Sequence, residues 1–137
     1  MVDIPGWGQE TATAIAASPL ITDQNIIFST HVYPQSYNQA AGRYVTPSDV
    51  KDLLQQTTRP CIVGEFGDIQ ADPVGTSKCD VKAVVEAAKA TGYEAVYGWA
   101  WNGDGGSLNM VFPVWWLNPV ATKYTVTSYF WPILNLL

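Results

Sequence analysis

The chain has 137 residues, of which 14% are charged, and it carries a formal net charge of −5 at pH 7. The length suits one domain with its own core, while the acidic balance disfavours a nucleic-acid partner and the hydrophobic content of 47% disfavours disorder. No apolar run is long enough to span a membrane, and residues 1–5 show neither the basic region nor the apolar core of a signal peptide.

Four strands and four helices are predicted to alternate along the chain. Short runs rich in β-branched and aromatic residues predict the strands, and apolar residues at helical spacing predict the helices. In chain order, the expected elements are a strand at 2–4, a helix at 10–17, a strand at 25–31, a helix from Thr46, a strand at 61–65, a helix at 80–91, a strand at 93–101 and a helix at 128–137. This alternation predicts an α/β fold with parallel strands and right-handed crossovers, in one domain covering residues 1–137.

The third predicted strand ends in a carboxylate. It lies in the stretch Arg59-Pro-Cys-Ile-Val-Gly-Glu-Phe-Gly67, where Gly64 lets the backbone pass close to its neighbours just before Glu65. Ligands bind at the carboxyl ends of parallel strands, so Glu65 is a candidate catalytic residue. The alternative is a structural glutamate paired with one of the seven arginines and lysines of the chain.

The two cysteines, Cys61 and Cys79, are expected to be free thiols. Alternation along the strand places Cys61 on the same face as Glu65, whereas Cys79 stands just before the next helix and outside the sheet. Neither thiol has a second cysteine or a histidine at metal-ligand spacing, so no metal or redox role is predicted.

Aromatic residues and the single histidine mark the ends of the neighbouring strands. His31 and Tyr33 are two residues apart and therefore share a face, as do Trp99 and Trp101 on the last strand. The phenol of Tyr33 can donate a hydrogen bond to a carboxylate and direct it at an anomeric carbon. The alternatives are a histidine satisfied within the core and tryptophans packed against the last helix.

The remaining tryptophans and loop aspartates are assigned structural roles. Trp115, Trp116 and Trp131 are expected in the core or at an interface, and Asp68 and Asp104 are expected to be solvated turn residues. A total of six tryptophans is nevertheless typical of proteins that stack sugar rings on indole faces.

Four segments together carry a family resemblance. They are Val2-Asp-Ile-Pro-Gly-Trp-Gly-Gln9, Thr30-His-Val-Tyr-Pro34, Gly64-Glu-Phe-Gly67 and Gly98-Trp-Ala-Trp-Asn-Gly103. In this order and spacing they resemble strands five to eight of family 5 glycoside hydrolases, and bacterial β-mannanases and related endoglucanases most of all. Each motif alone is weak, whereas the set is specific and spans nearly the whole chain. The resemblance implies half of a (β/α)8 barrel, built from four parallel βα units.

The resemblance also implies roles for individual residues. Members of this family cleave β-1,4-linked glucans or mannans with retention, through a glutamate nucleophile on strand seven that corresponds to Glu65. A histidine and a tyrosine at the end of strand six hold the nucleophile and the sugar, and they correspond to His31 and Tyr33. A strand-eight tryptophan forms the floor under the reacting sugar and matches Trp99.

Two further aromatic residues are candidate sugar platforms, because Trp7 and Trp101 fall where the similar mannanases carry loop or rim aromatics. The expected ligand is a β-1,4-linked polysaccharide or oligosaccharide. No metal or cofactor is implied, since two carboxyl groups suffice for the reaction. An extracellular location is expected from the family, because polymeric substrates do not enter cells.

The chain departs from the family in one respect that bears on activity. Retaining hydrolysis needs a nucleophile and a general acid/base about 5 Å apart, and the acid/base of the family is a glutamate after an asparagine on strand four. No Asn-Glu dipeptide occurs in this chain, which is expected to begin at strand five. We therefore expect a glycosidase half barrel that is weak or inactive alone. A non-catalytic carbohydrate-binding half barrel is the alternative.

Half a barrel leaves unpaired edges on its first and last strands and exposes the side chains that should fill the barrel. This predicts a homodimer, in which two copies either close head to tail into an eight-stranded ring or bury their open sheet faces. In the ring, the last strand of the second copy would replace strand four and bring its Asp104 towards the site. Asp104 is then the candidate acid/base, because the two copies of Glu65 would lie too far apart.

Overall fold

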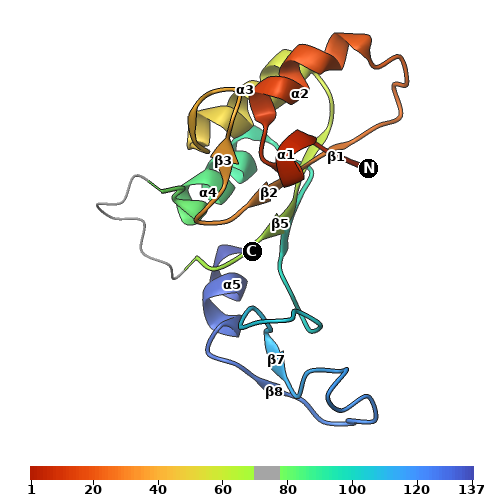
Figure 1. Ribbon diagram of the computed structural model, residues 1–137, viewed down its shortest axis with the longest axis vertical. Helices are drawn as coiled ribbons and strands as arrows, with labels where there is room; N and C mark the ends of the chain where they lie inside the picture. Colours follow the sequence, from red (N-terminus) through yellow and green to blue (C-terminus); the bar gives the residue numbers. More distant parts are fainter. Residues whose placement is uncertain (70–77) are drawn as a thin grey trace.

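The structure is a computed structural model of the chain and describes residues 1–69 and 78–137. Its main sheet has four parallel strands in the order β1-β2-β5-β6 (Figure 1). These strands are β1 Val2–Asp3, β2 Phe28–Val32, β5 Cys61–Phe66 and β6 Ala95–Gly98. The predicted α/β fold with four parallel strands is confirmed. The last strand is shorter than predicted, because β6 ends at Gly98, before both tryptophans.

The four predicted helices follow the strands in order. They are α2 Thr11–Ala17, α3 Pro47–Thr57, α4 Val81–Thr91 and α5 Phe130–Leu136. The short α1 Pro5–Gly8 and a 3-10 turn at Ser18–Leu20 were not predicted. The start of α3 follows from its N-terminal sequence, because the N–H of Thr46 donates to the Asp49 carboxylate at 2.8 Å. No helix in the described ranges is both long and apolar enough to cross a membrane.

Two short antiparallel pairs were not predicted. Strands β3 Tyr37–Asn38 and β4 Arg43–Tyr44 form a hairpin in the loop that follows β2. Strands β7 Val111–Phe112 and β8 Thr125–Val126 pair in the segment after β6, which extends away from the body of the protein (Figure 1). Two-residue strands lack the length over which alternation becomes recognisable in a sequence.

The hydrophobic core lies on one face of the sheet. Helices α2, α3 and α4 gather at that side of the strands (Figure 1). The core combines Ile4, which follows β1, and the strand residues Phe28, Val32, Val63 and Phe66 with helix residues Ala14, Val50, Leu53, Val81, Val84, Val85, Ala88, Ile133 and Leu136. On the opposite face, which a complete barrel would enclose, Tyr97 of β6 is 56% exposed.

A β-bulge at Gly64 changes which side chains share a face on β5. Thr30 of β2 pairs with Val63 while the next residue, His31, pairs with Glu65, so β5 carries one extra residue between them. Cys61 pairs with Phe28 and lies in the core on the helical face. The predicted shared face of Cys61 and Glu65 is therefore wrong, because the bulge interrupts the period-two alternation on which it rested.

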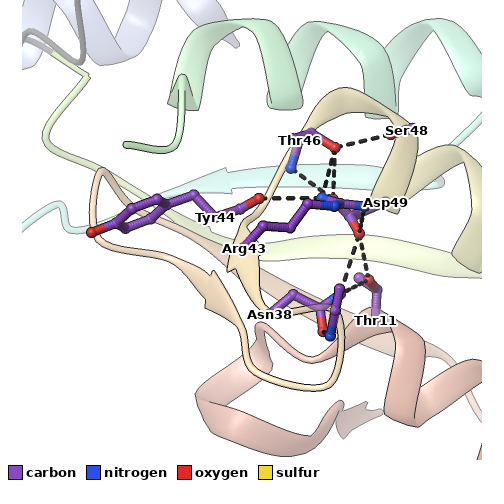
Figure 2. Close-up of polar contacts among 8 residues, drawn as sticks. Thr11, Asn38, Arg43, Tyr44, Thr46, Ser48 and Asp49 are labelled. Carbon is purple, nitrogen blue, oxygen red and sulfur yellow. Dashed lines mark hydrogen bonds and ion pairs between the residues drawn. The ribbon is translucent and has the colours of Figure 1, made fainter. Parts of the chain in front are cut away.

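Asp49, a buried carboxylate, fastens the loop that connects β2 to α3 (Figure 2). Arg43 donates to both of its oxygens, from Nη1 to Oδ2 at 2.5 Å and from Nη2 to Oδ1 at 3.1 Å. Asn38 Nδ2 and Thr11 Oγ1 donate to Oδ1 at 3.2 and 3.3 Å, and the hydroxyl of Thr46 donates to Oδ2 at 2.7 Å. One side chain thereby ties α2, the β3–β4 hairpin and α3 together.

Helix α5 approaches β6 so closely that position 98 admits only glycine. A Cβ at Gly98 would overlap Cγ2 of Ile133 and lie 3.0 Å from Cε of Met110. We expect Gly98→Ala to lower the free energy of unfolding by about 1–3 kcal/mol, through overpacking against α5. Urea denaturation measures this change. Gly105→Ala is the matched control, because a Cβ there meets no atom within 4 Å; equal unfolding midpoints for the two variants would contradict the prediction.

Candidate active site

The carboxyl ends of β2 and β5 bring three of the predicted site residues together. Tyr33 Oη donates a hydrogen bond to Glu65 Oε2 at 2.9 Å, and His31 Nδ1 lies 3.6 Å from the same oxygen. The side chain of Glu65 is 28% exposed. Its carboxylate is therefore held in one orientation and remains accessible to a ligand.

Tyr33 is a permanent hydrogen-bond donor in this arrangement. Burial, followed by the hydrogen bond to Glu65 and the charge of Glu65, raises the pKa of Tyr33 far above its usual value of 10.0. The phenol consequently keeps its proton throughout the pH range of enzyme assays. In the described part of the chain, no arginine or lysine lies within ion-pair distance of Glu65, so the alternative of a structural ion pair does not apply there.

His31 contacts a second carboxylate on its other side. His31 Nε2 lies 3.2 Å from Oδ1 of Asp3, an exposed residue at the end of β1. The backbone at Gly8 also packs against the ring, because a Cβ there would come within 2.5 Å of His31 Cγ. The imidazole is thus fixed between β1, β5 and α1 rather than satisfied in the apolar core. Asp3 was not predicted as a site residue, although its place at the end of a predicted parallel strand was a usable signal.

The hydroxyl of Ser36 shapes the turn that carries Tyr33. Ser36 Oγ accepts a hydrogen bond from the backbone N–H of Tyr33 at 2.8 Å and donates to the carbonyl oxygen of His31 at 3.3 Å. This local contact is typical of a serine in a turn. The contact orients the two residues that face Glu65, and it was not predicted.

Trp99 lies next to this cluster and is anchored at two atoms. Its backbone N–H donates to the carbonyl oxygen of Phe66 at 2.8 Å, and its indole Nε1 donates to Asp104 Oδ1 at 3.2 Å. The other oxygen of Asp104 accepts from the N–H groups of Gly106 at 2.6 Å and Leu108 at 3.2 Å. The Trp99 side chain is 38% exposed, so the indole remains available to a ligand.

Asp104 has the environment of an ionised hydrogen-bond acceptor. Burial raises its pKa, but the hydrogen bonds from Trp99 and from the two backbone N–H groups outweigh burial and hold the pKa below its usual range. A general acid must instead be protonated at the working pH. In a single copy, Asp104 therefore orients Trp99. Its role as the acid/base in a dimer stays a prediction.

Trp99 and Trp101 do not lie on one strand face, contrary to the prediction. The strand ends at Gly98, and the Trp101 ring packs edge-on against Phe130 of α5, with centroids 6.3 Å apart. Packing against the last helix was the alternative stated for Trp101. Trp7 is 89% exposed in the left-handed turn of α1, adjacent in sequence to the glycine that contacts His31.

The other tryptophans are exposed, so their prediction as core residues is wrong. Trp115 and Trp116 form an edge-to-face pair in the segment between β7 and β8, with centroids 5.9 Å apart. Trp131 packs on its neighbour Phe130 at 4.9 Å. These positions fall on a projecting segment and on the outer side of a terminal helix. Residue type alone does not predict such a location. Their prediction as interface residues is not tested.

Tyr129, at the N-cap of α5, reaches the ends of both β5 and β6. Its hydroxyl donates to the carbonyl oxygen of Trp99 at 2.5 Å and accepts from the backbone N–H of Asp68 at 3.2 Å. Tyr129 was not predicted as a site residue, because no local pattern indicates a contact between residues thirty positions apart.

Cys61 and Cys79 are free and buried, which confirms the predicted thiols. Burial raises the pKa of Cys61 to about 11 and that of Cys79 to about 12. Across residues 1–69 and 78–137, no group of three or more histidine, cysteine, aspartate or glutamate side chains could hold a metal ion. A hollow of about 550 Å³ lies at the β3–β4 hairpin, and none of its lining residues is a predicted site residue.

The chain is similar in sequence and in structure to known glycoside hydrolases. The sequence model of the family described as Cellulase (glycosyl hydrolase family 5) matches residues 1–105. A mannan endo-1,4-beta-mannosidase from Streptomyces lividans is 35% identical over 116 residues, which cover 79% of this chain and 27% of that protein.

Solved mannanases share the fold. The mannanase catalytic domain from Streptomyces sp. SirexAA-E superposes with a TM-score of 0.57 and 29% identity, covering 81% of this chain and 34% of that one. The β-mannanase from Thermomonospora fusca, solved with mannotriose, has a TM-score of 0.51 and 28% identity, with 80% and 35% covered. This chain thus spans about a third of these barrels, and its four βα units form half of a (β/α)8 barrel. The chain belongs to glycosyl hydrolase family 5.

Proposed function

We propose that this chain carries the nucleophile side of a retaining endo-β-1,4-mannanase or cellulase site, with Glu65 as the nucleophile. The supporting observation is the Glu65 carboxylate at the end of β5, oriented by Tyr33 at 2.9 Å and partly open to solvent. In the reaction, a carboxylate oxygen attacks the anomeric carbon, the bond to the leaving oxygen breaks, and water later hydrolyses the glycosyl ester. The mannanase relatives favour β-1,4-linked mannan as the substrate.

The second carboxyl group of this reaction is proposed to come from outside the single copy. A general acid/base must lie about 5 Å from the nucleophile. Asp3 faces the opposite nitrogen of His31, and Asp104 accepts hydrogen bonds from Trp99 and the backbone. The isolated chain is therefore weakly active or inactive on mannan.

Completion of the barrel by a second copy is the proposed route to activity. The open sheet face around Tyr97 and the unpaired edges of β1 and β6 provide the surface for it. Closure as a ring would bring Asp104 of the second copy towards the place of the acid/base. Light scattering gives the molar mass, and mannan hydrolysis measured on the same peak shows whether assembly restores activity. Because the substrate is a polymer, we place the reaction outside the cell.

The alternative function is carbohydrate binding without chemistry. The exposed indoles of Trp7 and Trp99 favour it, since Trp99 lies beside Tyr33 and Glu65 and Trp7 precedes the glycine that packs against His31. The two functions differ in whether Glu65 forms a covalent bond with a sugar.

A reagent with an activated leaving group distinguishes them. In 2,4-dinitrophenyl 2-deoxy-2-fluoro-β-mannoside the departing dinitrophenolate needs no proton, so labelling requires the nucleophile and not the missing acid/base. We expect the chain to gain the mass of one fluorosugar and to release one equivalent of dinitrophenolate. Binding of mannohexaose without any labelling would instead establish the non-catalytic function.

A further inference from the structure

Helix α5 is held in place along its whole length. At its C-terminal end, Lys89 Nζ of α4 donates to the carbonyl oxygens of Leu136 and Leu137, both at 2.9 Å. In its middle, the fully buried Ile133 lies against Gly98 of β6. The residue at its N-terminal end, Tyr129, therefore occupies a defined position relative to the sheet.

The hydroxyl of Tyr129 lies where the ends of β5 and β6 meet. It donates to the carbonyl oxygen of Trp99 and accepts from the N–H of Asp68. Gly67, two residues after Glu65, is surrounded by the same groups. A Cβ there would lie 2.6 Å from Tyr129 Oη, 2.9 Å from Tyr33 Cε1 and 3.3 Å from the carbonyl oxygen of Trp99.

We propose that Tyr129 is a positioning residue, which sets the location of the Trp99 indole relative to Glu65 through the backbone of Trp99. This inference rests on the proposed function. Tyr129 is 7% exposed and its hydroxyl is already engaged by two backbone groups, so it acts without touching the sugar. Asp104 fixes the indole N–H and Tyr129 fixes the carbonyl group of the same residue.

Tyr129 also remains a donor under assay conditions. Burial raises its pKa above the usual value of 10.0, so the hydroxyl keeps the proton that it donates to Trp99. Loss of this single hydroxyl would remove the link from the Trp99 carbonyl to α5 and to the loop after β5, and would leave the N–H of Trp99 on Phe66 as its remaining backbone contact with β5.

The test compares Tyr129→Phe with Tyr93→Phe. Tyr93 is 8% exposed, and its hydroxyl donates to the backbone carbonyl of Val50 at 3.0 Å, between α4 and α3. Both variants lose one buried phenolic hydroxyl and a hydrogen bond to a backbone carbonyl, so both should unfold at lower urea concentration. We expect only Tyr129→Phe to raise the fluoromannoside concentration for half-maximal labelling, by roughly five- to tenfold, with a smaller change in the maximal labelling rate.

Equal labelling by the two variants, with equal losses of stability, overturns the inference and leaves Tyr129 a structural residue. A wild-type chain that is not labelled refutes the proposed function instead. Near-ultraviolet circular dichroism then tests the role of Tyr129 without labelling. The contribution of Trp99 is obtained by subtracting, from the spectrum of each protein, the spectrum of the same protein that also carries Trp99→Phe. The Trp99 contribution should change with Tyr129→Phe and not with Tyr93→Phe, and an unchanged contribution overturns the inference.

Discussion

Glu65→Gln is expected to abolish covalent labelling by the activated fluoromannoside. The amide is not a nucleophile, although it occupies the same volume and can still accept the hydrogen bond from Tyr33. Loss of the attacking group should lower the labelling rate by roughly three orders of magnitude or more. Intact-protein mass spectrometry measures the fraction labelled, and urea denaturation verifies that the variant is folded.

Glu94→Gln provides the matched control for this experiment. Glu94 is an exposed glutamate just before β6, so the same chemical change there should leave labelling at the wild-type rate. Peptide mapping of the labelled wild-type chain should place the fluorosugar on Glu65. A label that persists in Glu65→Gln would assign the nucleophile to another side chain, and Asp3, on the far side of His31, would be tested next.

Asp49→Ala is expected to lower the free energy of unfolding by about 2–4 kcal/mol. The change removes the acceptor for Arg43, Asn38 and the backbone N–H of Thr46. Arg43 and Asn38 keep weaker partners, the Tyr44 carbonyl oxygen and the Thr11 hydroxyl, and lose the charged acceptor. The estimate is below that for a fully buried ion pair because the Arg43 side chain is 45% exposed. Asp52→Ala on the same helix is the control, and a loss of the same size there would contradict the prediction.

The effect of Asp49 should also depend on pH. Burial raises the pKa of Asp49, but the hydrogen bonds from Arg43 and Thr46 outweigh burial and hold the pKa below the unperturbed 3.8. A carboxylate with a lowered folded-state pKa stabilises the protein above its unfolded-state pKa, and this contribution is lost as the pH falls through the folded-state pKa. The difference in stability between wild type and Asp49→Ala should therefore be constant above about pH 5 and shrink below pH 4.

The parts of the site that were predicted share a physical cause. Parallel strands in sequence order end at one edge of the sheet, so the strand-end residues His31 and Glu65 had to meet once the alternation was recognised. The capped start of α3 was equally local, because Thr46 and Asp49 lie three residues apart. Such features depend on neighbours in the chain or on strand order, and both are readable from sequence.

The parts that were missed depend on packing between distant segments. The bulge at Gly64 reversed the face assigned to Cys61, and nothing in the run of small residues before it gives the register of β5. The contact of Tyr129 with Trp99 exists only because α5 packs back onto β6. The sequence pattern predicts that such a helix exists. Which residue at the end of the helix reaches the site follows only from the packed structure.

Because the core lies on one face of the sheet, the residues that stabilise the fold are distinct from the residues of the proposed site. In the described residues, the buried strand side chains pack against helices of the same chain, whereas Glu65 and Tyr97 on the opposite face are partly exposed. Substitutions on the helical face should therefore change unfolding at any protein concentration, whereas substitutions on the open face should leave the unfolding of a single copy nearly unchanged and should alter labelling or assembly instead. Under the proposed function, this is the behaviour expected of one fragment of a split enzyme, which folds by itself and needs a complementary fragment for turnover.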